Sequence, residues 1–423
     1  MSWQDSKVIQ VFSHPSDLLE PLLMGTLRAD IVRGKEIFSF EYDPGFLKSD
    51  AVFELDPGLK LYRGTQYLRE DERNFGMFLD SSPDRWGRVL MDRNEALKAT
   101  KEKRSPRLLM ESDYLLGVFD ESRMGALRFK TDKDVSFKND DPRQAVPPMT
   151  SLRALERAVY EFEHAVSRDD EQYSAGLSLL LAPGSSLGGA RPKASVKSET
   201  GHLWIAKFPS KNDNADSGAW EYLLYRLALN CRIVMADSSA DRFLSNKTTF
   251  LTKRFDRDDK NRRRHFFSAM TLLDYQDGAD YQSGVSYLEL VELILSRGSN
   301  VNDDLEQLWR RIVFNILVSN TDDHLRNHGF LLKDTGLALS PAYDLNPNPK
   351  GAGLHLNIDE QDNRLDTEIA RSVAHFFRLS ASRSSETISE MKKVVSRWRS
   401  EAGKIGMSSD EMEVMSSAFD INR

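Results

Sequence analysis

Cysteine is almost absent from this chain of 423 residues, in which Cys231 is the only one. A single thiol excludes a disulfide framework within the chain and a zinc site built from several cysteines. Because structural disulfides belong to oxidising compartments, their exclusion fits a reducing cytoplasm, and we expect a cytoplasmic protein.

Long apolar runs and an excess of basic residues are also missing. No stretch approaches the ~20 apolar residues that a membrane helix needs, and residues 1–5 do not have the pattern that begins a signal peptide. The formal net charge is -7 at pH 7, whereas a protein that binds nucleic acid on its own needs a basic face to displace counterions. We therefore expect no membrane association and no DNA binding by the chain alone.

The composition that remains is that of a globular protein, with 40% hydrophobic and 29% charged residues. A chain of this length can bury a full core and suggests two or three domains. We predict an α+β protein whose character changes along the chain. The predicted segments are a β-rich part (1–130), a linker rich in Lys, Asp, Asn and Pro (131–150), a mixed part (151–256) and a mostly helical part (257–423).

Periodic patterns place individual elements within these segments. Alternation of apolar and polar residues predicts strands, and apolar residues at helical spacing predict helices. Turn residues between two short apolar runs at 329–339 predict a hairpin. Strands are expected at 37–42, 203–208 and 249–255, and helices at 217–228, at 305–317 and from about Arg85 onward.

A polar segment follows directly after the helix expected at 305–317. Asp322 is followed by Asn327 five residues later, and Asp344 comes after the expected hairpin. In phosphoryl transfer one Asp orients the attacking hydroxyl, while an Asn and a second Asp hold Mg²⁺ against the phosphates. The spacing therefore predicts a phosphoryl-transfer site. A polar helix cap is the alternative, because Asn320 and Asp322 are good cap residues.

Further parts of such a site precede this motif. Residues 184–193 are rich in glycine, which lets backbone N–H groups approach phosphate oxygens. Lys207 lies in an apolar strand, where phosphates could pair with its ammonium group and Glu221 on the following helix could hold its side chain. A plain loop and a lysine on the solvated face of an edge strand are the alternatives. The order of all these parts along the chain favours phosphoryl transfer.

Six segments match the motifs of a known family: 75–88, 186–193, 204–209, 254–257, 320–327 and 340–345. On these motifs the chain resembles the HipA family of bacterial toxin kinases over nearly its whole length. The resemblance implies a two-lobed, protein-kinase-like fold, with a Gly-rich loop in a β-rich N-terminal part and a mostly helical C-terminal lobe. It also implies an ATP-dependent Ser/Thr protein kinase with ATP and Mg²⁺ as cofactors.

The resemblance assigns catalytic and metal-binding roles to five residues of this sequence. It implies that Asp322 is the catalytic base, with His324 beside it and Lys207 on the ATP phosphates. Asn327 and Asp344 are implied to hold Mg²⁺.

Nucleotide binding and self-inactivation are implied in the same way. Autophosphorylation of Ser186, or of its neighbour Ser185, would expel the Gly-rich loop and switch the kinase off. Lys253, Phe255 and Tyr343 would lie near the adenine. The full set of implied nucleotide-binding residues is Ser186, Leu187, Gly188, Gly189, Ala190, Lys207, Glu221, Lys253, Phe255, His324 and Tyr343.

The resemblance implies partners as well. Family members phosphorylate an aminoacyl-tRNA synthetase and so inhibit translation and growth, and a small DNA-binding, HipB-like antitoxin restrains them. We expect DNA to be reached only through such an antitoxin. Residues 265–271 depart from the Gln-Glu-Asp segment of the best-known members and resemble another branch of the family. A small-molecule or lipid kinase and a catalytically weak binding module are the alternative functions.

Overall fold

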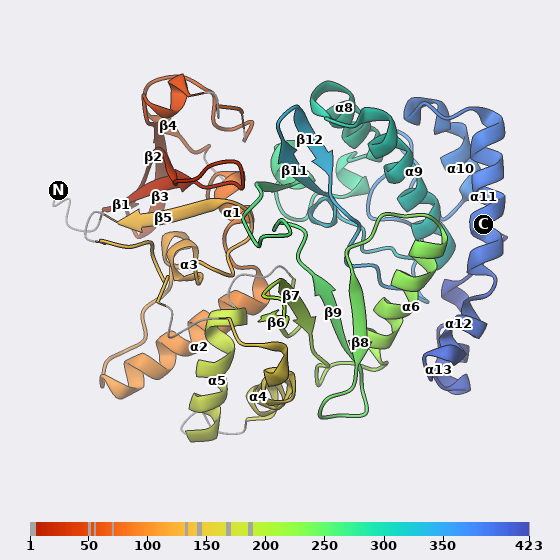
Figure 1. Ribbon diagram of the computed structural model, residues 1–423, viewed down its shortest axis with the longest axis horizontal. Coiled ribbons are helices and arrows are strands. Elements are labelled where there is room, and N and C mark those ends of the chain that lie inside the picture. The colour runs from red at the N-terminus through yellow and green to blue at the C-terminus, as the bar shows by residue number, and fades with distance from the viewer. Residues whose placement is uncertain are drawn as a thin grey trace. The chain divides into compact units, whose positions relative to one another are not determined.

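The structure is a computed structural model that describes residues 6–49, 52–54, 56–69, 72–131, 134–141, 146–165, 171–184 and 189–422 (Figure 1). Contacts divide it into two compact units. Unit 1 comprises Met1–Asn212 with Asp256–Phe267, and unit 2 comprises Asp213–Phe255 with Ser268–Arg423. This division does not test the predicted segment boundaries, which stay a prediction. Within the described ranges, no helix has both the length and the apolar character that a membrane crossing requires.

Unit 1 contains a five-stranded antiparallel sheet in the order β4-β3-β2-β1-β5. Side chains on one face, such as Ile9, Leu27 and Phe40, are fully buried, as the alternation of a half-buried sheet requires. The strands are β1 (Lys7–Ser13), β2 (Leu22–Val32), β3 (Lys35–Tyr42), β4 (Gln66–Tyr67) and β5 (Leu127–Thr131).

Helices and one further hairpin complete unit 1. The hairpin strands β6 (Lys193–Lys197) and β7 (Leu203–Lys207) are antiparallel, with Lys193 opposite Lys207. The helices are α1 (Gly76–Asp80), α2 (Arg85–Lys101), α3 (Glu111–Gly117), α4 (Leu152–His164) and α5 (Glu171–Gly184).

A buried guanidinium joins three of these segments. Arg123 is 0% exposed, and it donates to the backbone carbonyls of Ser81 and Leu115 (both 2.9 Å) and of Val118 (3.1 Å). Burying a cation is costly unless hydrogen bonds compensate. These bonds therefore fix the ends of α1 and α3 and the turn that leads into α2.

Unit 2 is built around one central helix, α9 (Val301–Val318). Nearly every side chain from Asp304 to Val318 is buried, because α9 packs against α8, α10 and α11 (Figure 1). The indole N–H of Trp309, on this helix, donates to the carbonyl of Ala370 (2.8 Å). Each buried polar side chain of this helix makes at least one hydrogen bond, as burial of polar groups requires: Asp304, Arg310, Arg311 and Asn315.

Hairpins and shorter helices make up the rest of unit 2. Two antiparallel hairpins are formed by β8 with β9 and by β11 with β12. Strand β10 (Phe266–Ser268) contains the junction between units 1 and 2. The remaining bounds are α6 (Ser217–Asn230), β8 (Ser238–Asp241), β9 (Thr249–Lys253), α7 (Ala269–Leu272), α8 (Tyr287–Arg297), β11 (Gly329–Lys333), β12 (Gly336–Leu339), α10 (Thr367–Ser372), α11 (Ala381–Val395), α12 (Trp398–Lys404) and α13 (Ser409–Val414).

The elements predicted from periodicity are confirmed. The strands expected at 37–42, 203–208 and 249–255 are β3, β7 and β9, and the hairpin is β11–β12. The expected helices are α2, α6 and α9, and α9 begins four residues earlier than its apolar pattern. That first turn carries Asp303 and Asp304, which suit a helix N-terminus but contribute nothing to an apolar repeat.

His265, in the segment that departs from the best-known family members, belongs to the core of unit 1. It is 2% exposed, its Nε2 lies 2.8 Å from the Ser13 hydroxyl, and its ring stacks on that of Phe267. Burial lowers the pKa of His265 to about 3. The folded protein therefore keeps this imidazole neutral at pH values where an exposed one is protonated.

We predict that acid destabilises the protein through His265. Between the unfolded pKa of about 6.5 and the folded value of about 3, only the unfolded state takes up this proton. The free energy of unfolding should fall as the pH drops through this window, by up to about 1.4 kcal/mol per pH unit. Urea unfolding between pH 7 and 4 should show a shallower pH dependence for His265→Gln than for wild type. The exposed His375→Gln should match wild type, and equal slopes for all three proteins would contradict the prediction.

Candidate active site

The predicted phosphoryl-transfer loop begins where the central helix of unit 2 ends. Ser319 closes α9 in the left-handed conformation (φ 49°) that helix C-termini favour. Its hydroxyl donates to the carbonyl of Ala418 (2.9 Å). Residues 320–328, here called the catalytic loop, therefore leave a rigid, buried element at a fixed angle.

The structure brings Asp322 and Asn327 together. The Asn327 amide nitrogen donates to the Asp322 backbone carbonyl (2.9 Å), across the short 3₁₀ turn Leu325–Asn327. The Asp322 side chain is exposed, whereas Asn327 is only 7% exposed. The nitrogen of Asn327 is thus used to shape the loop, and its amide oxygen is the atom suited to bind a cation.

Asp323 is the buried anchor of the catalytic loop. Its Oδ2 accepts hydrogen bonds from the Tyr287 hydroxyl (2.6 Å) and the Asn315 amide (2.7 Å), and lies 3.0 Å from Nε2 of His328. Burial raises the pKa of Asp323, but the charge and hydrogen bond of His328 and the Tyr287 hydroxyl outweigh it and hold that pKa below its usual value. Asp323 is therefore a fixed anion that positions its neighbour Asp322.

The ring of His324 packs against that of a second histidine. Its ring meets that of His355 edge-on, with the ring centroids 5.8 Å apart and the planes at 79°. In the part of the chain that the structure describes, its buried Nδ1 has no hydrogen-bond partner. This ring is therefore held by packing against His355.

Asp344 has a left-handed backbone conformation next to the catalytic loop. Its φ of 59° lies in the left-handed region, which is uncommon outside glycine and clusters at functional sites. The preceding Tyr343 donates its hydroxyl to the carbonyl of Arg326 (2.6 Å), and Asn346 donates its amide to Oδ1 of Asp344 (3.4 Å). The segment that carries Asp344 is therefore tied directly to the loop that carries Asn327.

The three predicted adenine contacts, Lys253, Phe255 and Tyr343, all lie in unit 2. The rings of Phe255 and Tyr343 are 5.4 Å apart and tilted by 36°, and Lys253 is the last residue of β9. The structure thus places two aromatic rings side by side, as a stacking surface for a base requires.

The donor set of Asn327 and Asp344 fits Mg²⁺. Both offer oxygen, and Mg²⁺ in phosphoryl-transfer sites is held by one or two carboxylates together with substrate phosphates. Within the described ranges, no group of three or more His, Cys, Asp or Glu side chains could hold a metal ion.

The remaining predicted residues fall in other parts of the structure. Lys207 is the half-buried last residue of β7 in unit 1, and Glu221 is a buried residue of α6 in unit 2. Their pairing stays a prediction. Ser185, Ser186, Leu187 and Gly188 lie outside the described residues, and Ala190 is exposed.

Sequence reasoning missed the residues that hold the end of the Gly-rich segment. The Gly189 N–H donates to Oδ2 of Asp84 (2.7 Å), and its carbonyl accepts from the Trp86 N–H (3.1 Å). The Trp86 indole donates to the carbonyl of Lys193 (2.9 Å). Asp84 and Trp86 belong to the N-terminal motif at 75–88, which was quoted for the resemblance but given no role. We call Asp84 and Trp86 the loop anchor.

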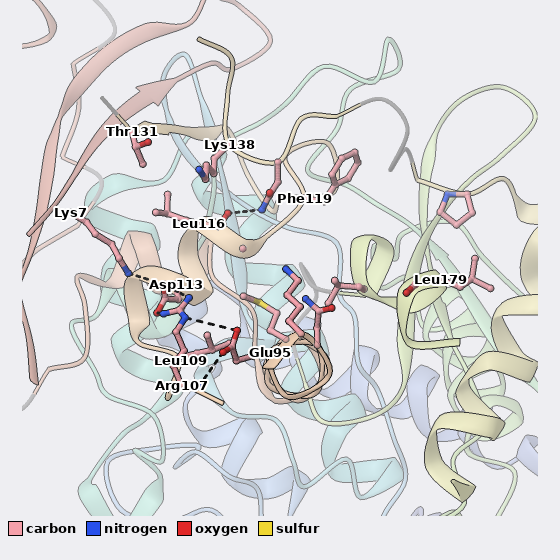
Figure 2. Close-up of a pocket in the computed structure, with 18 residues that line it drawn as sticks. Lys7, Glu95, Arg107, Leu109, Asp113, Leu116, Phe119, Thr131, Lys138 and Leu179 are labelled. Carbon is pink, nitrogen blue, oxygen red and sulfur yellow. Dashed lines mark hydrogen bonds and ion pairs between the residues drawn. The ribbon is translucent and has the colours of Figure 1, made fainter. Parts of the chain in front are cut away.

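A separate cavity of about 920 Å³ lies in unit 1, against α2, α3 and α5 (Figure 2). Its charged side chains point toward one another: Lys7 and Arg107 both pair with Asp113 at 2.8 Å. The Arg107 backbone N–H donates to Glu95 (3.1 Å). None of the predicted site residues lines this cavity, and it adds nothing to the phosphoryl-transfer site.

Comparison with known proteins agrees with these features. Residues 185–398 match the family model of the HipA-like C-terminal domain. A Haemophilus influenzae protein that is provisionally named as a kinase is 35% identical to this chain over 101 residues. That match covers 22% of this chain, and the chain spans only 29% of the length of this curated relative.

Solved structures extend the comparison to the whole chain. HipA of Shewanella oneidensis MR-1, solved with HipB and its operator DNA, superposes with a TM-score of 0.65 over 97% of this chain and 94% of that one. At 17% identity this match speaks for the fold alone, and it confirms the predicted α+β, protein-kinase-like fold. The Helicobacter pylori proinflammatory kinase CtkA gives a TM-score of only 0.37 at 12% identity, over 54% of this chain and 88% of that one, and no inference rests on it.

The family model covers half of the sequence, with the catalytic loop, Asp344 and Lys207 all inside the matched range. This chain therefore belongs to the family of proteins that share the HipA-like C-terminal domain.

Proposed function

We propose that the protein is an ATP-dependent Ser/Thr protein kinase. The observation that carries the proposal is the joint anchoring of two polar segments at the end of α9. Asp322 and Asn327 share one short loop, and Tyr343 ties the Asp344 segment to the same loop through the carbonyl of Arg326. Membership of the HipA-like family supports the proposal.

The chemistry needs little from the protein beyond positioning and charge. The exposed Asp322 would orient the substrate hydroxyl and accept its proton late in the transfer. Lys207 would neutralise charge on the phosphates. Asn327 and Asp344 would hold Mg²⁺, which supplies charge neutralisation on the phosphate oxygens when bound.

Adenine binding and loop placement complete the proposed site. The paired rings of Phe255 and Tyr343 would receive the base, together with Lys253, two residues before Phe255. His324, two residues after Asp322, would lie near the phosphates. Gly189 and Ala190 would close the Gly-rich loop over the nucleotide. Glu221 would hold the side chain of Lys207 in its working position.

We propose the remaining biology of the family for this chain as well. It would act in the cytoplasm as the toxin of a toxin–antitoxin pair, inhibit translation by phosphorylating an aminoacyl-tRNA synthetase, and be restrained by a HipB-like antitoxin that brings it to DNA. The Shewanella HipA was solved with HipB and operator DNA, which supports a partner of this kind. His265, in the segment that departs from the best-known members, packs in the core of unit 1.

Replacing the proposed base tests the central assignment. We expect Asp322→Asn to lower phosphate transfer to protein by a factor of about 10² or more, because the amide cannot accept the hydroxyl proton. ATP affinity should stay within about threefold, since the side chain is exposed and its backbone carbonyl still accepts from Asn327. Labelled-phosphate transfer and nucleotide-binding titration provide the two readouts. Asp334→Asn, in the exposed turn between β11 and β12, is the matched control, and wild-type transfer by Asp322→Asn would refute the assignment.

The loop anchor generates a prediction about nucleotide affinity. Asn at position 84 can still cap α2 by accepting from Arg85, but it turns an N–H toward the Gly189 N–H in place of the acceptor. Losing an acceptor for a partly buried N–H costs about 1–3 kcal/mol. We expect Asp84→Asn to raise the KM for ATP about tenfold with a smaller effect on kcat. Asp17→Asn, on the surface of unit 1, should leave both unchanged, and an unaltered KM in Asp84→Asn would show that the anchor does not serve the nucleotide.

Self-inactivation gives a third test. A phosphate on Ser186 would add about -1.5 to -2 charges to a loop proposed to meet the phosphates of ATP, and repulsion would expel the loop. Incubation with Mg-ATP should place phosphate on Ser186 or Ser185, detected by mass spectrometry, while activity declines. Ser186→Ala should retain activity over the same period. Absence of phosphate from both residues in an active preparation would exclude this switch.

A further inference from the structure

Two buried asparagines connect the catalytic loop to the Asp344 segment. Asn315, on α9, donates its amide N–H to Oδ2 of Asp323 (2.7 Å) and accepts from the amide of Asn320 (3.0 Å). Asn320 in turn accepts from the backbone N–H of Asn346, two residues after Asp344 (3.1 Å). Both asparagines are 1% exposed. We call this chain of three hydrogen bonds the amide relay.

Both ends of the amide relay fix its direction. The carboxylate of Asp323 can only accept, and the backbone N–H of Asn346 can only donate. Each amide between them must therefore present its nitrogen toward Asp323 and its oxygen toward Asn346. Turning either one by 180° would set two donors or two acceptors against each other, at a buried site where each unmet group is costly. The amide relay consequently has one stable arrangement.

The Asp344 segment is held to α9 from its other side too. Arg311, one turn before Asn315 on α9, donates its Nη2 to the carbonyl of Ser340, four residues before Asp344. The backbone N–H of Asn348 donates to the carbonyl of Ser319 at the end of α9 (3.0 Å). Asp344, with its left-handed backbone, lies between attachments that all lead to the same helix.

We propose that Asn315 and Asn320 are positioning residues that couple the placement of the catalytic loop to that of Asp344. This inference rests on the proposed kinase function. Phosphoryl transfer requires the base on one segment and the metal ligand on the other to hold a common geometry, and displacements near 1 Å cost large factors in rate. Neither asparagine has to touch ATP, Mg²⁺ or substrate. Their effect is transmitted through Asp323 at one end and Asn346 at the other.

Asn320→Asp tests the proposed coupling without changing the volume of the side chain. It preserves the volume and the oxygen that accepts from Asn346, but it replaces the donor that faces Asn315 with a second acceptor. Asn302→Asp is the matched control, because this exposed amide lies in the first turn of α9, accepts from Arg378 and, within the described residues, makes no contact with the catalytic loop or the Asp344 segment. Asn320→Ser serves as a second variant that removes the donor without adding a charge.

We expect Asn320→Asp to lower kcat at least about tenfold and to raise the Mg²⁺ concentration for half-maximal transfer several-fold. Binding of a fluorescent ATP analogue without Mg²⁺ should be unchanged. Asn320→Ser should show the same pattern in weaker form, and Asn302→Asp should stay within twofold of wild type. If the role of Asn320 were purely structural, Asn320→Asp would lower the melting temperature, but the folded molecules would keep the wild-type kcat and Mg²⁺ dependence. That outcome would overturn the proposal.

Failure of the kinase function would give a different result. Wild-type protein that binds the ATP analogue in a Mg²⁺-dependent way but transfers no phosphate to protein would refute the proposed function. The amide relay would still be tested by the Mg²⁺ dependence of that binding, which should be weakened in Asn320→Asp and Asn320→Ser. If Asn320→Asp fails to fold, Asn320→Ser carries the same two measurements, and wild-type behaviour by it would refute the coupling.

Discussion

The buried carboxylate of Asp323 is the interaction on which the candidate site depends. It collects donors from α8, from α9 and from His328, the residue before β11, and so it gathers three segments around one oxygen. A buried anion is tolerated only where several donors surround it, so the loop cannot drift without exposing an uncompensated charge. The preceding residue, Asp322, is exposed to solvent but is therefore held in place by a buried residue of the core.

Local patterns were sufficient for much of the fold. The apolar repeat of α9 and the alternation of β3, β7 and β9 follow from how each element buries one face, which is a property of neighbouring residues. The order of Asp322, Asn327 and Asp344 also lies within a short stretch, and the structure joins the Asp322 and Asn327 positions by a hydrogen bond.

What sequence could not supply are contacts between distant residues. Asp84 and Gly189 are 105 positions apart, and nothing in either segment indicates that one accepts from the other. Asn315 and Asp323 are closer, but periodicity would treat an asparagine on a buried helix as an interruption of the apolar pattern. Asp323 itself looked like one more charge in a crowded loop. Its role became visible only when its burial and its three partners were known.

The left-handed backbone of Asp344 has a consequence for how this position can vary in evolution. If Asp344 binds Mg²⁺ as proposed, a residue there has to satisfy two independent requirements: a conformation that most side chains avoid, and an oxygen directed at the cation. Glycine meets the first requirement and fails the second, whereas glutamate meets the second and pays strain for the first. Only aspartate and asparagine combine both, so the set of acceptable residues is already narrow before any contact with a nucleotide is considered. Selection on the backbone and selection on chemistry thus act on the same side chain.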